Sequence, residues 1–280
     1  NTGEILLVAG KGHEKIQDYG RRKLFFSDQK VILKSIKFKN KSLSKDIKLN
    51  IIKEESNSKI SNKLVIKNIS INSKIIKKND IFFAIKGKKI DGNRFVPEAF
   101  KKKSSLSIVN RINKKYSTSK QIKVKNTLDF LTQCSSIFRE NINAKIITIT
   151  GSCGKTTLKE MIGETLKNIS KTTYSQKSFN NKYGVPLSLF NLKQNDEFGV
   201  FEVGMDKKGE IDSLSKIINP NLAVITNVTY AHAKNFKGLH EIALAKSEII
   251  QNIKNGGTVV LNRDDKFFNL FKKNSFKKEI

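Results

Sequence analysis

The residues best suited to chemistry in this sequence lie in one glycine loop, Thr150-Gly-Ser-Cys-Gly-Lys-Thr-Thr157. A phosphate loop (P-loop) needs glycines so that backbone N–H groups can surround an anion, a lysine for the outer phosphates and a hydroxyl for Mg²⁺. The loop has all three, with the spacing G-x-x-G-K-T. It therefore predicts a nucleotide phosphate site made by Gly151, Ser152, Cys153, Gly154, Lys155, Thr156 and Thr157. The alternative is an ordinary turn that starts a helix.

Three other polar residues could join this loop. Glu202 ends an apolar run, and a lone buried carboxylate is costly unless it is paired or binds a cation. We favour a metal ligand over a glutamate that faces water from an edge strand. His232 follows another apolar run and could approach the same edge, although a histidine alone is more often an ordinary surface or core residue. Lys246, taken alone, is one more solvated lysine.

Hydrophobic spacing in the second half predicts the elements that must position these residues. Apolar runs predict buried strands, and apolar residues at helical spacing predict helices between them. The strands are expected at 146–149, 198–203, 222–225 and 258–261, and the helices at 158–169, 211–218 and 239–253. Strands that alternate with helices predict an α/β fold with a doubly wound, mostly parallel sheet.

The first half is less regular. Short apolar strands and turns between 64 and 110, with a helix at 96–100, predict a small α/β domain that precedes the P-loop domain, and 127–139 reads as a helix. Residues 37–63 have weak periodicity, so we expect a linker near 40–45. Before it, we expect a strand at 4–9, a glycine loop and a short helix capped by Ser27 or Asp28. The expected domains are 1–42, 43–142 and 143–280.

Composition excludes several functions. The chain has 54 Lys and Arg against 25 Asp and Glu, a formal charge of +29, but the basic residues are scattered lysines with few arginines. Sequence-specific nucleic-acid binding is therefore not expected, although polyanions should bind weakly at low salt. The sequence has no apolar run of 18 residues, so it predicts no transmembrane helix. Cys134 and Cys153 have no metal or disulfide spacing, which favours a reducing cytoplasm.

Several ordered motifs resemble the Mur ligases. The central domain of that family is similar to residues 147–157, 180–186, 202–211, 227–232 and 245–248, and the substrate domain of one member is similar to 71–74, 78–87 and 91–95. The resemblance implies an ATP-dependent ligase of peptidoglycan precursor synthesis. Its substrates would be UDP-N-acetylmuramoyl tripeptide and D-alanyl-D-alanine, joined through an acyl phosphate by a monomeric cytoplasmic enzyme.

The resemblance also implies roles for the candidate residues. Lys155 would stabilise the phosphoryl group of ATP, Thr156 and Glu202 would hold one Mg²⁺, and His232 would help to hold a second. Lys246 matches a lysine that the family carbamylates into an anionic metal ligand.

Substrate contacts follow in the same way. Ser73 and Lys74 would face the UDP part of the substrate, and Asn180 and Asn181 its muramoyl side.

The N-terminal segment has its own resemblance, to the C-terminal end of the family member that adds the third amino acid of the peptide. By that likeness Gly10, Gly12 and Glu14 would contact an incoming diamino acid. We expect a fragment that lacks a C-terminal domain and is poorly active alone. The joint near residue 40 is either a true fusion of two ligases or an artefact of a fragmentary gene model. The alternatives are another ligase of the superfamily, such as folylpolyglutamate synthetase, and a basic nucleic-acid-binding module.

Overall fold

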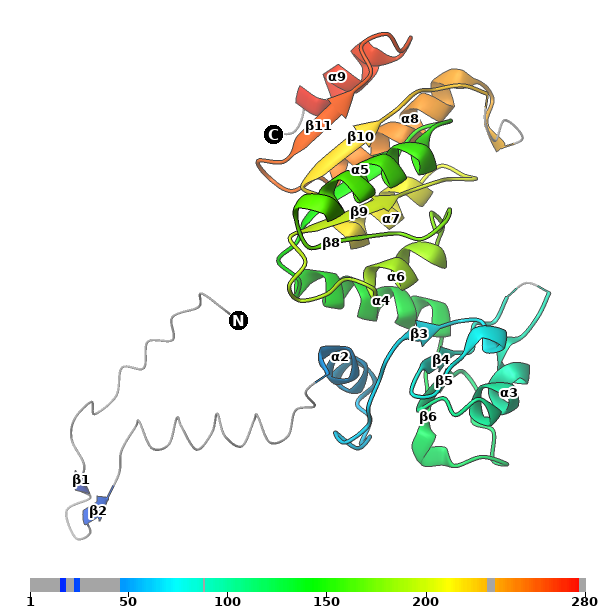
Figure 1. Ribbon diagram of the computed structural model, residues 1–280, viewed down its shortest axis with the longest axis vertical. Coiled ribbons are helices and arrows are strands. Elements are labelled where there is room, and N and C mark those ends of the chain that lie inside the picture. The colour runs from blue at the N-terminus through cyan, green and yellow to red at the C-terminus, as the bar shows by residue number, and fades with distance from the viewer. Residues whose placement is uncertain (1–15, 19–22, 26–45, 88, 231–234, 277–280) are drawn as a thin grey trace.

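A computed structural model describes residues 16–18, 23–25, 46–87, 89–230 and 235–276 (Figure 1). The predicted strand at 4–9, the glycine loop with Gly10, Gly12 and Glu14, the helix after Ser27, the linker at 40–45 and His232 all lie outside these residues. The first described elements are two short antiparallel strands, β1 (Ile16–Asp18) and β2 (Lys23–Phe25).

A parallel sheet of four strands forms the first of two α/β units. Its order is β3-β4-β5-β6, which follows the order of the chain. The strands are β3 (Ile69–Ser70), β4 (Ile81–Phe83), β5 (Leu106–Val109) and β6 (Gln121–Lys123). Single turns of 3-10 helix, η1 (Ser73–Ile75), η2 (Gly92–Phe95) and η3 (Thr118–Lys120), connect them together with helix α3 (Val96–Lys101).

The second sheet has five strands and is also parallel throughout. Its order is β11-β10-β7-β9-β8, so β7 lies in the middle of the sheet, between β10 and β9. The strands are β7 (Lys145–Thr150), β8 (Thr172–Tyr174), β9 (Phe198–Glu202), β10 (Leu222–Ile225) and β11 (Thr258–Leu261). This arrangement confirms the predicted α/β class, with sheets that are wholly rather than mostly parallel.

Helices cover both faces of the second sheet (Figure 1). Helix α5 (Lys155–Ile169) packs on one face, against Ile149, Val200 and Val224. The alternate residues of the same strands, such as Ile146 and Phe201, point to the other face and belong to the main core. That core also includes residues of α4 (Thr127–Glu140), α6 (Gly184–Leu189), α7 (Glu210–Ile218) and α8 (Leu239–Gln251).

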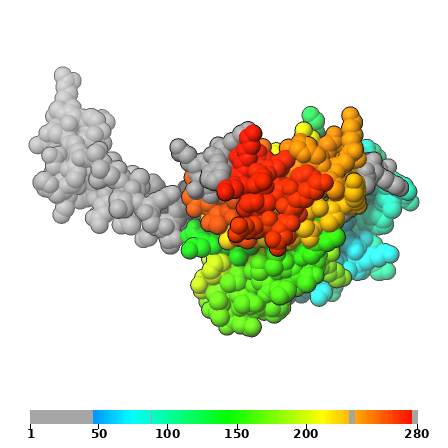
Figure 2. All heavy atoms as spheres, turned by 90° about the horizontal axis from the view of Figure 1, so that it is seen from above, coloured from blue at the N-terminus to red at the C-terminus, as the bar shows by residue number. Residues whose placement is uncertain are grey.

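The main core is continuous between the two units because α4 contacts both of them. Helix α4 packs against β4 of the first unit and against α6 and α7 of the second. The last helix, α9 (Phe268–Phe276), packs on α8 and β11, and Figure 2 shows this end of the chain gathered on one face. Within the described ranges, no helix has the length and apolar character that a bilayer crossing requires.

Two local expectations differ from the structure. Leu64 to Ile66, expected as a strand, has no strand pairing. Helix α2 (Ile47–Ser56) occupies part of the weakly periodic stretch. Asp46 caps its first turn by accepting hydrogen bonds from the amides of Lys48 and Leu49, and the apolar side of the helix packs on α4. The surrounding residues 37–63 are rich in Lys, Ser and Asn, and this composition hid the short apolar stripe.

Candidate nucleotide and metal site

The glycine loop connects β7 to α5, and its glycines are required by the backbone. Gly151 has φ 152° and lies so close to the neighbouring chain that a Cβ atom there would meet Thr226 Oγ1 at 1.8 Å. Gly154 has φ 79°, in the left-handed region that glycine adopts without strain, and it immediately precedes the first residue of α5. The loop therefore turns sharply from the sheet into the helix, as a phosphate loop must.

The segment after β10 holds the loop from the side. Asn227 accepts two hydrogen bonds, from Ser152 N to its carbonyl oxygen (2.9 Å) and from Cys153 N to its side-chain oxygen (3.0 Å). The Ser152 hydroxyl donates to Thr229 O (3.0 Å) and accepts from Thr229 N (2.8 Å), while Thr226 Oγ1 donates to Cys153 O (2.7 Å). These contacts fix the first half of the loop before any ligand binds.

The first turn of α5 is left open to an anion. Gly154, at the N-cap position, supplies no side-chain hydrogen bond, and the first amides of a helix have no partner within the helix. Lys155 Nζ donates to Gly151 O (2.9 Å) and Ser152 O (3.2 Å), so its ammonium lies inside the loop. Burial lowers the pKa of Lys155, an effect that the Glu202 carboxylate opposes. A phosphate would meet both a positive charge and unpaired N–H groups here.

Glu202 has the surroundings of a cation ligand. It is fully buried at the carboxyl end of β9, beside the glycine loop, because β9 pairs with β7. Its Oε1 accepts a hydrogen bond from Asn180 Nδ2 (2.9 Å), whereas its Oε2 has no hydrogen-bond partner among the described residues. A buried, unpaired carboxylate oxygen is costly, and a bound cation would remove that cost. The residues present therefore fit a hard cation such as Mg²⁺.

Two more predicted metal ligands lie near the loop. Thr156 Oγ1, on the first turn of α5, lies 3.4 Å from Ser178 Oγ. Lys246 is only 3% exposed on α8, and burial, reinforced by the nearby ammonium of Lys155, lowers its pKa to about 7. An amine with that pKa is largely uncharged slightly above neutral pH, so it can react as a nucleophile. No group of three His, Cys, Asp or Glu side chains in the described ranges forms a metal site by itself, so a metal here needs other donors.

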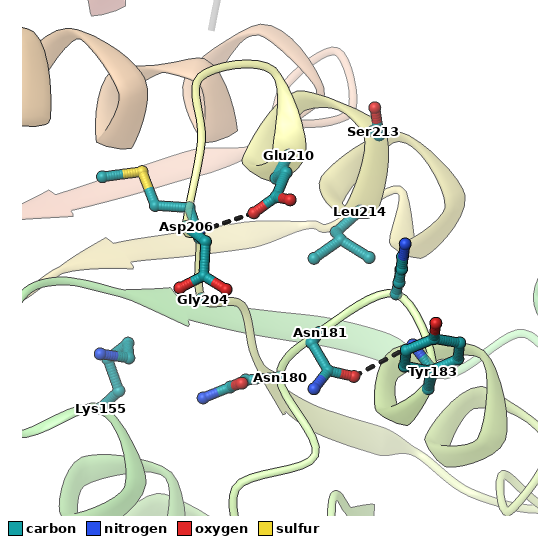
Figure 3. Close-up of a pocket in the computed structure, with 11 residues that line it drawn as sticks. Lys155, Asn180, Asn181, Tyr183, Gly204, Asp206, Glu210, Ser213 and Leu214 are labelled. Atoms are coloured by element: carbon teal, nitrogen blue, oxygen red, sulfur yellow. Dashed lines mark hydrogen bonds between the residues drawn. The ribbon is translucent and has the colours of Figure 1, made fainter. Parts of the chain in front are cut away.

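A cavity of about 410 Å³ opens beside these residues. Lys155 and Asn180 lie on one side of it, and Asp206 and Glu210 lie opposite (Figure 3). Glu210 Oε2 accepts from the amide of Asp206 (2.6 Å) and so fixes the start of α7 over the cavity. The cavity is large enough for part of a second substrate next to the phosphate loop.

Other predicted residues have structural contacts of their own. Asn181 Oδ1 accepts from Tyr183 N and Gly184 N, both at 3.0 Å, at the start of α6, although Asn181 also lines the cavity. In the first unit, the buried Ser73 hydroxyl donates to Glu98 Oε2 (2.7 Å).

Lys74 follows on η1. Its amide donates to Asn72 Oδ1 (2.9 Å), and the residue is exposed. The residues that the structure brings together at the glycine loop are Lys155, Thr156, Asn180, Glu202 and Lys246.

Lys159, one helical turn after Lys155, is a buried residue that the sequence pattern did not predict. The helical spacing placed Met161 and Ile169 on the apolar side of α5, but they are 63% and 76% exposed, whereas Lys159 is fully buried. Its Nζ donates to two backbone carbonyls in the loop after β8. The only available signal was its position four residues after Lys155, on the same side of the helix.

Comparisons with known proteins agree with this geometry. Residues 149–280 match the Mur ligase middle domain, and residues 65–139 match the Mur ligase family catalytic domain. The UDP-N-acetylmuramoyl-tripeptide–D-alanyl-D-alanine ligase of Buchnera aphidicola subsp. Acyrthosiphon pisum (strain APS) is 38% identical over 210 residues, which are 75% of this chain and 46% of that protein. The ligase of the same name from Rickettsia prowazekii (strain Madrid E) is 35% identical, with the same coverage.

Solved structures give the same result. A crystal structure of MurF from Acinetobacter baumannii superposes with a TM-score of 0.74 at 32% identity, over 81% of this chain and 50% of that one. MurF from Thermotoga maritima in complex with ADP superposes with a TM-score of 0.68 at 30% identity, over 77% and 49%. The chain thus spans about half the length of the relatives it matches. Two domain matches in order, these relatives and a glycine loop beside a buried glutamate establish that the chain belongs to the Mur ligase family.

Proposed function

We propose that this chain is the ATP-binding and substrate-binding part of a ligase that joins D-alanyl-D-alanine to UDP-N-acetylmuramoyl tripeptide. The names of the relatives support this choice of substrates. The single observation that supports the nucleotide site most directly is the uncapped start of α5, with the Lys155 ammonium beside it. The ADP in the Thermotoga maritima relative supports a nucleotide as the ligand.

The proposed reaction has two steps. The terminal carboxylate of the peptide attacks the γ-phosphorus of ATP, and the bond to the bridging oxygen breaks as ADP leaves. The amine of D-alanyl-D-alanine then attacks the acyl carbon, phosphate leaves as the amide forms, and one proton is released. Phosphoryl transfer of this kind depends mainly on positioning and charge stabilisation.

Lys155 and the loop amides would supply that charge stabilisation. Lys155 Nζ donates to the carbonyls of Gly151 and Ser152. A small rotation of its flexible side chain would exchange these neutral acceptors for phosphate oxygens. The phosphate oxygens carry negative charge and the carbonyl oxygens do not, so the exchange adds charge attraction to the ammonium and favours the bound state.

Thr156 and Glu202 would hold one Mg²⁺, which would neutralise the charge of the phosphate oxygens. Lys246, once carbamylated, would be a further anionic metal ligand. The free Oε2 of Glu202 supports this assignment. His232 remains a predicted ligand of a second ion. Substrate assignments to Ser73, Lys74, Asn180 and Asn181 belong to the same proposal, with residues 43–142 as the substrate unit and 143–280 as the nucleotide unit.

Calorimetry with Mg-ATP tests the proposed nucleotide site without requiring ligation by this chain. We expect Lys155→Ala to weaken Mg-ATP binding at least tenfold, because the positive charge inside the loop is lost. Lys167→Ala is the matched control, since Lys167 is an exposed lysine on the same helix and its loss should leave the affinity unchanged. Equal affinities for Lys155→Ala and the unmodified chain would overturn the assignment.

A further inference from the structure

The buried side chain of Lys159 ties the phosphate-loop helix to a neighbouring loop. It lies on the second turn of α5 and is fully buried. Its Nζ donates to Ser175 O at 2.6 Å and to Lys177 O at 2.7 Å, and it lies 2.7 Å from Glu160 Oε1. Three partners satisfy the three N–H groups of an ammonium, which explains how a lysine can be buried here.

The two carbonyls belong to a bend that follows β8. Ser175 continues the sheet, since its amide donates to Val200 O of β9 at 2.9 Å. Two residues later, Lys177 has φ 49°, a left-handed conformation that is uncommon for a residue other than glycine. The ammonium of Lys159 lies between these two carbonyls, so it holds the bend at the point where the chain leaves the sheet.

This bend leads directly to contacts with two of the predicted magnesium ligands, Thr156 and Glu202. Ser178 Oγ lies 3.4 Å from Thr156 Oγ1. Asn180 Nδ2 donates to Glu202 Oε1 at 2.9 Å, and Asn180 O accepts from the amide of Gly204 at 2.8 Å. One short loop therefore contacts a hydroxyl on α5 and a carboxylate on β9, and Lys159 fixes the beginning of that loop.

We infer that Lys159 is a positioning residue for the magnesium site: by holding the carbonyls of Ser175 and Lys177, it places the loop that orients Thr156 and Glu202. This inference rests on the proposed function, because it concerns the metal that accompanies ATP. The partners of the Lys159 ammonium are Ser175 O, Lys177 O and Glu160 Oε1, so its link to the two ligands runs through the loop. Removing the Lys159 amine should therefore weaken ATP binding in the presence of Mg²⁺ more than it weakens ATP binding without the metal.

The test is to measure ATP affinity by calorimetry in Mg²⁺ and in EDTA, for the unmodified chain and for Lys159→Met. The ratio of the two affinities is the factor by which Mg²⁺ strengthens ATP binding. We expect Lys159→Met to reduce this factor at least tenfold, while affinity in EDTA stays within threefold. Mn²⁺ used as the metal should give an altered electron paramagnetic resonance spectrum in the variant. A merely structural role would leave the factor and the spectrum unchanged, which would overturn the inference.

Two controls separate the buried amine from its surroundings. Glu160→Gln removes only the half-exposed acidic partner, and Lys167→Met removes an exposed lysine from the same helix. Both should retain the full effect of Mg²⁺. If either control variant reduced the Mg²⁺ effect as much as Lys159→Met does, a change in the net charge of α5 would explain the loss. The inference would then be wrong.

A milder variant covers the case in which Lys159→Met does not fold, as judged by circular dichroism. Lys159→Gln keeps one side-chain donor group at the same place and should give an intermediate loss of the Mg²⁺ effect. An Mg²⁺ effect in this variant equal to that of the unmodified chain would overturn the inference. An unmodified chain that binds no ATP at all would instead contradict the proposed function, so the two failures are distinguishable.

Discussion

Asn180 Nδ2 donates a hydrogen bond of 2.9 Å to Glu202 Oε1, while the other oxygen of the same carboxylate is buried without a hydrogen-bond partner in the described ranges. The two oxygens thus differ in their surroundings. A buried polar atom left without a partner costs about 1–3 kcal/mol. A cation bound at Oε2 would remove that cost, whereas the hydrogen bond from Asn180 prevents the carboxylate from turning away.

Replacing this carboxylate should separate metal binding from folding. Glu202→Gln keeps the shape of the side chain but removes its charge, so we expect the effect of Mg²⁺ on ATP affinity to fall at least tenfold, or about 1.4 kcal/mol. Calorimetry with and without Mg²⁺ measures it, and circular dichroism checks the fold. Glu197→Gln, an exposed glutamate just before β9, is the control. A full Mg²⁺ effect in Glu202→Gln would show that Glu202 is not a metal ligand.

Much of the nucleotide unit could be predicted from sequence because four of its five strands are short apolar runs between turns. The fifth strand, β8, has the sequence Thr-Thr-Tyr and gave no such signal. The strands at 222–225 and 258–261 have the predicted bounds, and the helix that begins at Lys155 follows the glycine loop as expected. The spacing of Gly151, Gly154 and Lys155 is a local pattern, and it is enough to predict the glycine loop and the helix after it.

Contacts between distant residues could not be predicted in this way. Asn180 and Glu202 are 22 residues apart and meet only because β9 pairs with β7 and β8. Arg139 was also missed: it is 2% exposed, and its Nε donates to Ile218 O at 3.0 Å, which joins α4 to the end of α7. Charged residues are expected at the surface, so periodicity places Arg139 and Lys159 in water. Their burial is explained only by the backbone carbonyls that accept hydrogen bonds from the two side chains.

The turn into the phosphate loop should be intolerant of a side chain. A Cβ on Gly151 would lie 1.8 Å from Thr226 Oγ1, and the glycine has a positive φ of 152°. We expect Gly151→Ala to lower the free energy of unfolding by roughly 2–4 kcal/mol, from strain and a displaced loop. Urea unfolding measures this change. Gly238→Ala is the matched control, because Gly238 has φ 168° and no atom within 4 Å of the added Cβ, so its stability should stay nearly unchanged.

A similar small loss in both glycine variants would contradict the geometry of the loop. In addition, Gly151→Ala should weaken Mg-ATP binding even under conditions where the protein remains folded. Calorimetry at low temperature, well below the unfolding transition, checks this second consequence.

The low pKa of Lys246 predicts how stability changes with pH. Burial, with the ammonium of Lys155, lowers the pKa of Lys246 to about 7, whereas an unfolded lysine titrates near a pKa of roughly 10.4. Between these values the unfolded chain binds more protons, so the contribution of Lys246 to stability rises with pH, by up to about 1.4 kcal/mol per unit. We expect Lys246→Met to be more stable than the unmodified chain near pH 7, with the difference shrinking toward pH 10.

Urea unfolding at several pH values measures that difference, in EDTA and in buffer free of carbon dioxide so that neither metal nor carbamate contributes. Lys167→Met is the control, because its exposed lysine should give no difference that depends on pH. A stability difference for Lys246→Met that is constant from pH 7 to pH 10 would contradict the low pKa.

The two cysteines provide a direct reporter of the phosphate loop. Cys153 is exposed within the loop, whereas Cys134 is fully buried on α4 and burial raises its pKa to about 12. The thiolate is the reactive form, so N-ethylmaleimide should label Cys153 and leave Cys134 unmodified near pH 7.5. We expect Mg-ATP to slow this labelling at least fivefold, as measured by mass spectrometry of the intact chain. Because the amide of Cys153 is already held by Asn227, the protection would reflect phosphates covering the thiol rather than ordering of the loop. In Lys155→Ala the same concentration of Mg-ATP should protect weakly. Equal protection in both proteins would show that Lys155 does not contribute to nucleotide binding, and no protection in the unmodified chain would place the nucleotide elsewhere.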